Sequence, residues 1–175
     1  MLSTIATICE LAIVLAAISP PVLWRLKVPL LAAGAVAAVY GALWTWKTLK
    51  EDAPDGAPPG SAFSPKITIA VAATVTTTML ISALLNAHLG RSGVLAGAAI
   101  AGFADTHSAA VSVASLVASG KLNVSEAAMP ILAGLTTNTV TKIVLSFTAG
   151  GRNFAARVAP GLLLVIVAAW IAMLV

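Results

Sequence analysis

Charged residues are scarce in this chain, and so are the residue types that form disulfides and transition-metal centres. Of its 175 residues only 9% are charged, whereas 59% are hydrophobic. Soluble domains carry about 25% charged residues, so a soluble globular protein is excluded. The single cysteine, Cys9, excludes an intrachain disulfide. Two histidines and one cysteine are few for a transition-metal site, which favours several imidazoles or thiolates.

Clustered basic residues are also missing. The net charge is +4, but the lysines and arginines are scattered singly, with no basic tract or patch interleaved with aromatic residues. Basic loops are explained by membrane orientation, so we expect no nucleic-acid partner. The first 19 residues have no basic residue ahead of their apolar part, and Glu10 interrupts that part. We therefore interpret them as an uncleaved first helix rather than a signal peptide.

Long apolar runs dominate what is present. The mean hydropathy is +1.01, and a membrane-spanning helix needs about 20 mostly apolar residues. Six segments qualify or nearly do: 2–19, 28–46, 66–87, 93–119, 125–149 and 157–175. The sequence predicts an all-α, polytopic integral membrane bundle in the lipid bilayer, with about six transmembrane helices, or five if one segment is re-entrant. So few spans favour a homo-oligomer, and a dimer first.

A polar, proline- and glycine-rich stretch divides these segments. Residues 51–65 are predicted to be a flexible linker between a two-helix hairpin at 1–50 and a four-helix block at 66–175. Pro20-Pro21 is expected to end the first helix. The positive-inside rule places both termini outside, because this orientation puts five basic residues on the cytoplasmic side and four on the outer side. The cytoplasmic group would be Arg25, Lys27, Arg91, Arg152 and Arg157, and the outer group Lys47, Lys50, Lys66 and Lys121.

Polar residues recur at helical spacing inside the apolar segments. The three stripes are Asp105, Ser108, Ser112, Ser115 and Ser119; Thr74, Thr78, Ser82 and Asn86; and Gly134, Asn138, Lys142 and Ser146. Small and hydroxylated residues let membrane helices pack closely, which accounts for most of the serines and threonines. Packing does not account for Asp105 and Lys142, because an intramembrane ionisable group marks a pathway or binding site by default.

The turn near Lys121 sets the expected depth of these groups. In an antiparallel pair, residues equidistant from the turn lie level, so Asp105 should face Asn138. Lys142 lies one helical turn further, and its long side chain can still reach Asp105. The two would form an ion pair that is neutral overall. The same construction about Gly90-Arg91 places Asp105 between Thr74 and Thr78, and counting from Met1 brings Glu10 close to mid-membrane.

Two backbone features lie close to this level. Gly102 precedes Asp105, and Pro130 lies early in the fifth segment. Unwound backbone at membrane depth occurs only where it is buried in protein or lines a water-filled cavity. The sequence leaves a broken helix near Gly102–Asp105 and a simple proline kink equally open.

The run Asp105-Thr-His107-Ser108 contains the letters of a hydrolase triad. Neighbouring side chains on one helix point about 100° apart, so the run cannot act as a triad, and we expect no enzyme activity. His107 would lie away from the Asp105 face and donate to a backbone carbonyl of a neighbouring helix. A hard cation with oxygen ligands from Asp105, Asn138 and threonines, or a proton relay through Asp105 with Lys142 or His107, both fit.

Three motifs resemble a known family. They are GFADTHSAAVSVASL (102–116), LTTNTVTK (135–142) and GGRNFAARVAPG (150–161). They are similar to the membrane domain of unknown function that often follows the MgtC/SapB domain in bacterial proteins, most strongly from about Phe63 onward. The resemblance implies the bacterial inner (cytoplasmic) membrane, an unassigned transporter activity, and a link to magnesium homeostasis. The family's polar positions correspond here to Asp105, His107, Asn138 and Lys142.

The leading hypothesis is a small transporter or channel for a cation, for which a divalent ion such as magnesium and coupling to protons are both open. The alternative is a non-transporting regulatory or partner subunit in which Asp105–Lys142 is a structural ion pair. No cofactor is expected beyond a bound cation, whose ligands would include Asp105 and Asn138. The candidate pathway residues are Asp105, Asn138, Lys142, His107, Thr137, Ser108, Thr78 and Glu10.

Overall fold

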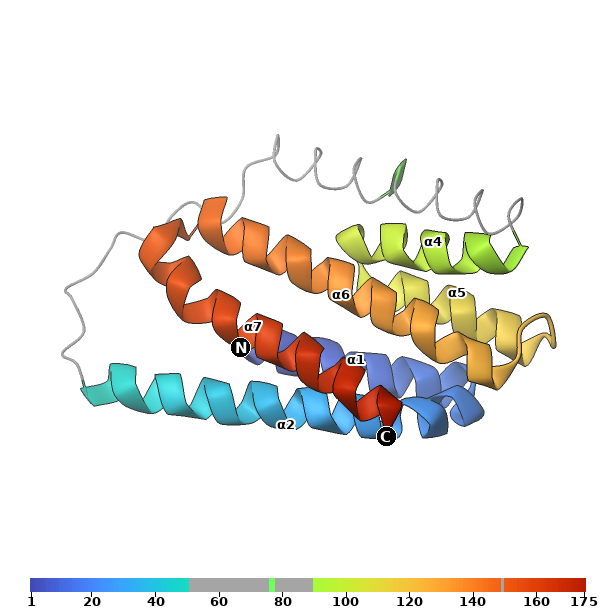
Figure 1. Cartoon of the computed structure of the whole chain (residues 1–175), viewed down its shortest axis with the longest axis horizontal. Helices are drawn as coiled ribbons and strands as arrows, with labels where there is room; N and C mark the ends of the chain where they lie inside the picture. The colour runs from blue at the N-terminus through green and yellow to red at the C-terminus, as the bar shows by residue number, and fades with distance from the viewer. Residues whose placement is uncertain (51–75, 78–89, 149) are drawn as a thin grey trace.

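The computed structural model describes residues 1–50, 76–77, 90–148 and 150–175. Six α-helices and no strand occur in these ranges (Figure 1). They are α1 (Leu2–Ile18), α2 (Pro20–Lys50), α4 (Gly90–Ala104), α5 (Thr106–Ala118), α6 (Val124–Thr148) and α7 (Gly151–Leu174). The all-α prediction is confirmed. The predicted linker at 51–65 and nearly all of the predicted helix at 66–87 lie outside the described residues.

Helices α1 and α2 form an antiparallel hairpin with Ser19 as the one residue between them. Pro20 opens α2, as expected of a residue that lacks a backbone N–H and suits the first helical turn. The predicted end of the first helix is confirmed, but the second begins at Pro20 rather than residue 28. Ile8 lies against Gly34, and Met1 against Gly41, so the two helices stay in contact along α1.

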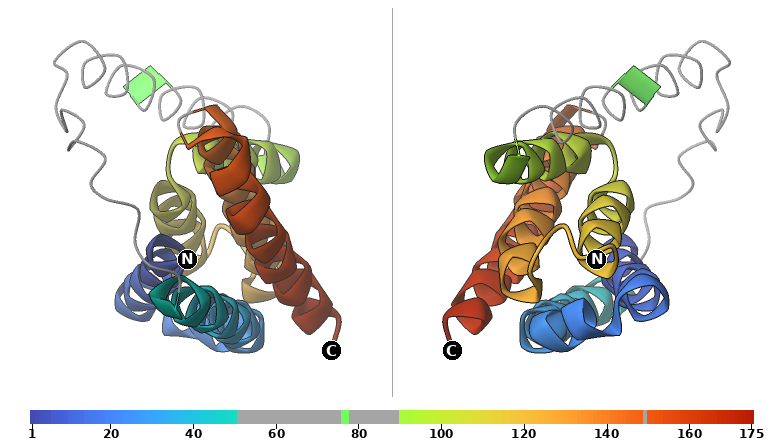
Figure 2. Two further views of the ribbon diagram at one scale, coloured as in Figure 1. Left: turned by 90° about the vertical axis from the view of Figure 1, so that its left-hand side faces the viewer. Right: turned by 90° about the vertical axis from the view of Figure 1, so that its right-hand side faces the viewer.

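Helices α4 and α5 divide the segment that the sequence predicts as one long helix at 93–119. Asp105 alone separates them, in an extended conformation with φ −159° and ψ 123°. The break near Gly102–Asp105 is confirmed. The chain also reverses there: α4 and α5 lie side by side in opposite directions, so that Gly90 and Ser119 share one end of the bundle (Figures 1 and 2). This re-entrant hairpin has its tip at Asp105.

Helices α6 and α7 form the second long hairpin. Gly151 adopts a φ of +78° at their junction, a conformation that glycine adopts without steric cost. The last helix therefore begins at residue 151, six residues before the predicted 157. Tyr40 of α2 donates a 2.8 Å hydrogen bond to the Arg157 carbonyl, and Trp170 Nε1 donates to Thr136 Oγ1 at 3.0 Å. These contacts hold α7 against both α2 and α6.

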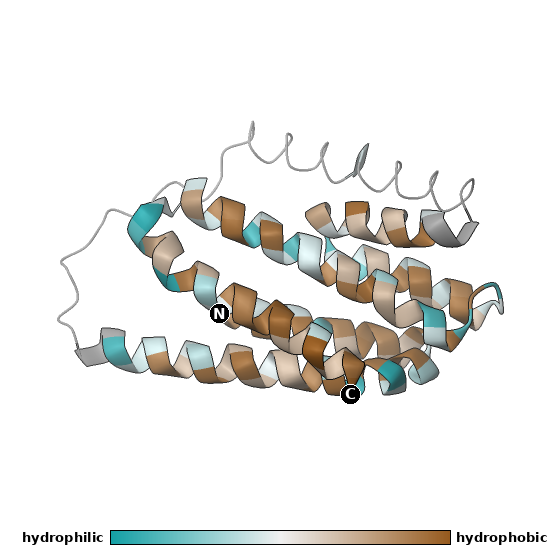
Figure 3. Ribbon diagram, in the orientation of Figure 1, coloured by the Kyte–Doolittle hydropathy of each residue, from teal (hydrophilic) through white to brown (hydrophobic). Residues whose placement is uncertain are grey.

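Three helices are long and apolar enough to cross a membrane: Pro20–Lys47, Val124–Thr148 and Gly151–Leu174. Leu2–Ile18, Gly93–Ala104 and Thr106–Ala118 are apolar but shorter. Figure 3 shows apolar residues along most of the helices, and hydrophilic residues both at the ends of the bundle and partway along α6. These features identify a membrane protein. The hairpin of α1 and α2 packs directly on the rest, because α1 contacts α5 and α2 contacts α6 and α7.

The two ends of the bundle can be named by residues that meet there. At the Met1 end, Met1 lies beside Gly41 of α2 and Gly161 of α7. At the Lys121 end lie Ser19 and the turn at Lys121 (Figure 1). Helices α1 and α7 run in the same direction (Figure 1). The placement of both termini outside stays a prediction.

The re-entrant hairpin changes the expected path of the chain between the two ends of the bundle. A single pass through 93–119 would carry the chain to the other side, whereas a reversal returns it to its starting side. Basic residues then divide differently: Arg25, Lys27 and Lys121 belong to the Lys121 end, and Lys47, Arg152 and Arg157 to the Met1 end.

Candidate functional site

The hairpin tip is packed against the middle of α6 through glycine. A methyl group at Gly102 would lie 2.5 Å from Gly134 Cα, and closer still to the Gly134 carbonyl oxygen and Thr137 Oγ1. A methyl group at Gly134 would lie 3.0 Å from both the Ala98 carbonyl oxygen and Ala109 Cβ. Glycine at both positions is thus what allows α4, α5 and α6 to meet at the tip.

Two threonines of α6 bind the backbone of α4. Thr137 Oγ1 donates to the Ala99 carbonyl at 2.7 Å, and Thr141 Oγ1 donates to the Phe103 carbonyl at 3.0 Å. The last carbonyls of a helix have no partner within it. The Thr141 hydroxyl therefore replaces the backbone donor that the Phe103 carbonyl would have in a continuous helix. Thr137, predicted to be an ion ligand, has its hydroxyl engaged in this packing and in bonds to its own helix.

Asp105 is the N-cap of α5. Its carboxylate accepts from the backbone amides of His107 at 3.1 Å and Ser108 at 2.9 Å. It also accepts from Ser108 Oγ at 2.7 Å and lies 2.8 Å from His107 Nδ1. Capping explains how a carboxylate can be held here, since the free amides and the positive end of the helix dipole compensate its charge. The side chain remains 36% exposed.

His107 connects this carboxylate to α1. Its Nδ1 faces Asp105, while its Nε2 lies 3.1 Å from Glu10 Oε2. The second contact is within ion-pair distance but lacks hydrogen-bond geometry, since Nε2 has no hydrogen-bond partner among the described residues. The expectation that His107 points away from Asp105 and binds a backbone carbonyl is wrong. It assumed one continuous helix, whereas Asp105 precedes the helix and folds back onto its first turn.

Lys142 is directed towards α1 as well. Its Nζ donates to Thr7 Oγ1 at 2.9 Å, and it interacts electrostatically with Glu10. No ion pair joins Lys142 to Asp105 in the part of the chain that the structure describes. The expected pair is replaced because Asp105 is committed to the start of α5, while Lys142 lies one turn beyond the tip. We call Glu10, Asp105, His107 and Lys142 the tip cluster.

Asn138 and Thr106 complete the surroundings of the tip. Asn138 Oδ1 and Thr106 Oγ1 are buried and have no hydrogen-bond partner among the described residues. The approach of Ala109 to Gly134 on antiparallel helices makes Asp105 level with Asn138. This depth relation was predicted from the turn at Lys121 and is confirmed. Thr106 was not predicted as a site residue, because only the break at Asp105 brings it to the first turn of a helix.

The tip cluster lies halfway along the bundle. Contacts of Met1 with Gly41 and Ile8 with Gly34 make Glu10 level with about Ala32. Ala32 is near the middle of the Pro20–Lys47 span. The cluster thus brings charged groups of α1, α5 and α6 together at mid-depth, where an unpaired charge is costly. Thr78, predicted near the same site, lies outside the described residues.

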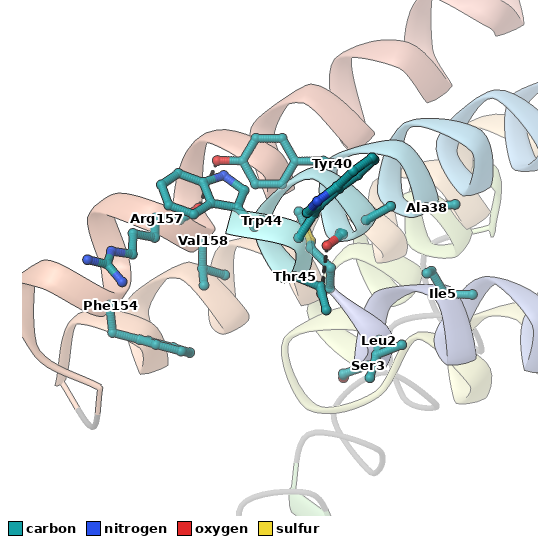
Figure 4. Close-up of a pocket in the computed structure, with 14 residues that line it drawn as sticks. Leu2, Ser3, Ile5, Ala38, Tyr40, Trp44, Thr45, Phe154, Arg157 and Val158 are labelled. Atoms are coloured by element: carbon teal, nitrogen blue, oxygen red, sulfur yellow. Dashed lines mark hydrogen bonds between the residues drawn. The ribbon is translucent and has the colours of Figure 1, made fainter. Parts of the chain in front are cut away.

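Two cavities open from the Met1 end. One of about 490 Å³ lies between α1, α6 and α7. Its lining is Met1, Ser3, Thr4, Lys142, Leu145, Ser146, Gly150, Phe154, Val158 and Leu162, so most of its wall is apolar. Its wall reaches the tip cluster at Lys142 but does not include Asp105. The other, of about 1010 Å³, lies between α1, α2 and α7. Figure 4 shows its aromatic wall, which includes Tyr40, Trp44 and Phe154, with Arg157 at its side.

The residues present do not form a cage for a transition metal. Within the described ranges, no group of three His, Cys, Asp or Glu side chains could hold a metal ion. Both oxygens of Asp105 already accept hydrogen bonds from protein donors. Of the two predicted metal ligands, Asp105 already uses its carboxylate to cap α5. The side-chain oxygen of Asn138 has no hydrogen-bond partner among the described residues.

Comparison with known proteins places the chain in a family. Residues 1–150 match the domain of unknown function DUF4010. The chain belongs to the DUF4010 family. This confirms the resemblance to a membrane domain of unknown function, and the match does not connect it to MgtC/SapB proteins. The DUF4010 match includes α1 and α2 and ends before α7, whereas the sequence motifs favoured the C-terminal two thirds. No curated protein and no solved structure matches the chain.

Proposed function

We propose that this DUF4010 protein is a small transporter for a cation, coupled to protons through the tip cluster. The observation that carries the proposal is the chain of Glu10, His107 and Asp105 across α1 and the hairpin tip. The imidazole lies 2.8 Å from one carboxylate and 3.1 Å from the other. A histidine between two carboxylates can take up a proton from one side and release it to the other.

The charge of the tip cluster supports exchange rather than simple conduction. With His107 neutral, the two carboxylates and the Lys142 ammonium sum to one negative charge. The other charged side chains of the described residues lie towards the ends of the helices, so they do not compensate it. One proton on His107, or one monovalent cation near the tip, restores neutrality. Since an uncompensated charge at this depth is costly, binding of the two is expected to be mutually exclusive.

The cavity of about 490 Å³ at the Met1 end supports access to the tip cluster from one side. The alternative of a non-transporting subunit depended on a direct Asp105–Lys142 pair, and the contacts of both residues lie elsewhere. The proposal includes the bacterial inner membrane as the location. It also includes a homo-oligomer, a dimer first, because Glu10 is 63% exposed halfway along an apolar helix and a second protomer would cover it.

The experiment is proton flux in proteoliposomes that contain a pH-sensitive dye. An imposed gradient of Na⁺, K⁺ or Mg²⁺ should change the internal pH for the unmodified protein. Asp105→Asn should abolish the change while leaving the fold intact, because asparagine caps helices as well as aspartate. The matched control is Lys121→Gln, which removes a charge from an exposed turn. Undiminished flux in Asp105→Asn would refute the proposal.

A further inference from the structure

The break at Asp105 leaves backbone carbonyls without donors at the end of α4. The Ala101 carbonyl accepts from the Asp105 amide at 2.8 Å, and the Phe103 carbonyl accepts from Thr141. No donor among the described residues binds the carbonyl of Gly102 or Ala104. These oxygens form the negative end of the α4 dipole. Gly102 is buried and Ala104 half-buried. Buried polar groups without partners are rare in proteins, so the Gly102 carbonyl requires an explanation.

Two side-chain oxygens without partners lie at the same break. Thr106 is 1% exposed, and its hydroxyl oxygen makes no hydrogen bond within the described part of the chain. Asn138 Oδ1 is likewise buried and unsatisfied. Gly134 fits between Ala98 of α4 and Ala109 of α5. Asn138 follows on the same face of α6, one turn on, so it faces the point where α4 ends and α5 begins.

We propose that the hairpin tip binds one dehydrated monovalent cation, of the class of Na⁺ and K⁺. Its ligands are Asn138 Oδ1, Thr106 Oγ1 and the carbonyl oxygens of Gly102 and Ala104. Neutral oxygens and the end of a broken helix are the groups that coordinate such ions at membrane depth. This inference rests on the proposed function and assigns its cation. The ion site is separate from the proton-carrying side chains Glu10 and His107.

The chemistry of the tip favours a monovalent ion over a divalent one or an anion. Asp105 contributes its charge from nearby, but its oxygens are held by four donors. One carboxylate in this state, without a second acidic ligand, is a poor match for the coordination that Ca²⁺ requires. An anion is excluded by the oxygen lining and by Asp105, which already occupies the amides at the start of α5.

The test is equilibrium binding of ²²Na⁺, and of ⁸⁶Rb⁺ in place of K⁺, to the purified full chain in detergent. One of the two ions should bind to the unmodified protein at about one per chain, with ⁴⁵Ca²⁺ failing to compete. Thr106→Val should weaken binding on the order of tenfold, because it deletes one ligand and keeps the side-chain shape. Asn138→Leu should do the same. Thr139→Val is the matched control, since the buried Thr139 hydroxyl already bonds the Leu135 carbonyl.

The outcomes separate this inference from the proposed function. Absence of binding by either ion, as expected if only water satisfies these oxygens, would overturn the site even if proton flux persists. Unchanged affinity in both Thr106→Val and Asn138→Leu would also overturn it. Binding that is lost in the two variants and kept in Thr139→Val supports the site. If that pattern is found while liposomes show no flux, the proposed transport function fails and the ion site stands.

Discussion

Replacing Gly102 with alanine should separate α4 from α6 at the hairpin tip. The added methyl group would lie 2.5 Å from Gly134 Cα, about 1 Å short of the optimum separation of two carbon atoms. The closest obstacles are the backbone of Gly134 and the hydroxyl of Thr137, which α6 holds in place. Backbone cannot rotate away as a flexible side chain can, so the helices themselves must move apart.

The cost of that movement has two sources at the interface of α4 and α6. Overpacking of a tight interface typically costs about 1–3 kcal/mol. A shift of about 1 Å would also lengthen the bonds from Thr137 to Ala99 and from Thr141 to Phe103, and each is worth about 0.6 kcal/mol in a membrane protein. Alanine offsets about 0.5–1 kcal/mol through its better helix propensity. The expected net loss is about 1–4 kcal/mol of unfolding free energy.

Unfolding in mixed micelles of increasing SDS fraction, followed by circular dichroism, measures this loss. Gly34→Ala is the matched control in α2, because its methyl group would meet only Ile8 Cγ2, at an ordinary 3.8 Å. That variant should be neutral or slightly stabilised. If Gly102→Ala unfolds at the same SDS fraction as Gly34→Ala, the close approach of α4 and α6 at the tip is wrong.

Three further predictions concern side-chain contacts around the tip and α7. Asp105→Ala should lose about 1–2 kcal/mol of stability, because it removes the cap of α5, whereas Asp105→Asn should lose little; equal SDS midpoints would contradict the cap. Thr7→Val and Lys142→Met should show a coupling of about 1 kcal/mol in a double-mutant cycle; simple additivity would rule out their hydrogen bond. Trp170→Phe should cost about 0.6–1 kcal/mol through the lost bond to Thr136, and an unchanged unfolding midpoint would count against it.

The depth of the site was predictable because it depends on one local turn. The turn at Lys121 fixes the register of two antiparallel helices, and the structure confirms that Asp105 lies level with Asn138. The weakness of the helix near Gly102 was predictable for a similar reason. Aspartate is a preferred N-cap residue, and Asp105 within the apolar segment could have revealed a helix start at Thr106.

The partners of the charged groups were not predictable from the sequence. A break shows where a helix stops but not whether the next one continues or reverses, since that depends on packing against α6. The reversal at Asp105 removes the helix face opposite Lys142, which then reaches Thr7 instead. It also turns His107 towards Glu10, on a helix nearly a hundred residues earlier in the chain. Such long-range contacts have no local sequence signal.

The one-residue reversal at Asp105 also makes the two halves of the protein unequal as barriers. From the tip towards Lys121, the bundle contains α4 and α5 in addition to the long helices, so more helices pack together in that half. The half towards Met1 lacks both, and there a cavity of about 490 Å³ descends as far as Lys142. Under the proposed transport function, a hydrophilic solute would meet a shorter barrier on the Met1 side, whereas passage towards Lys121 would require the hairpin itself to shift. Because a single path is crossed over the same barriers from either side, movement of the hairpin would limit the rate of crossing in both directions.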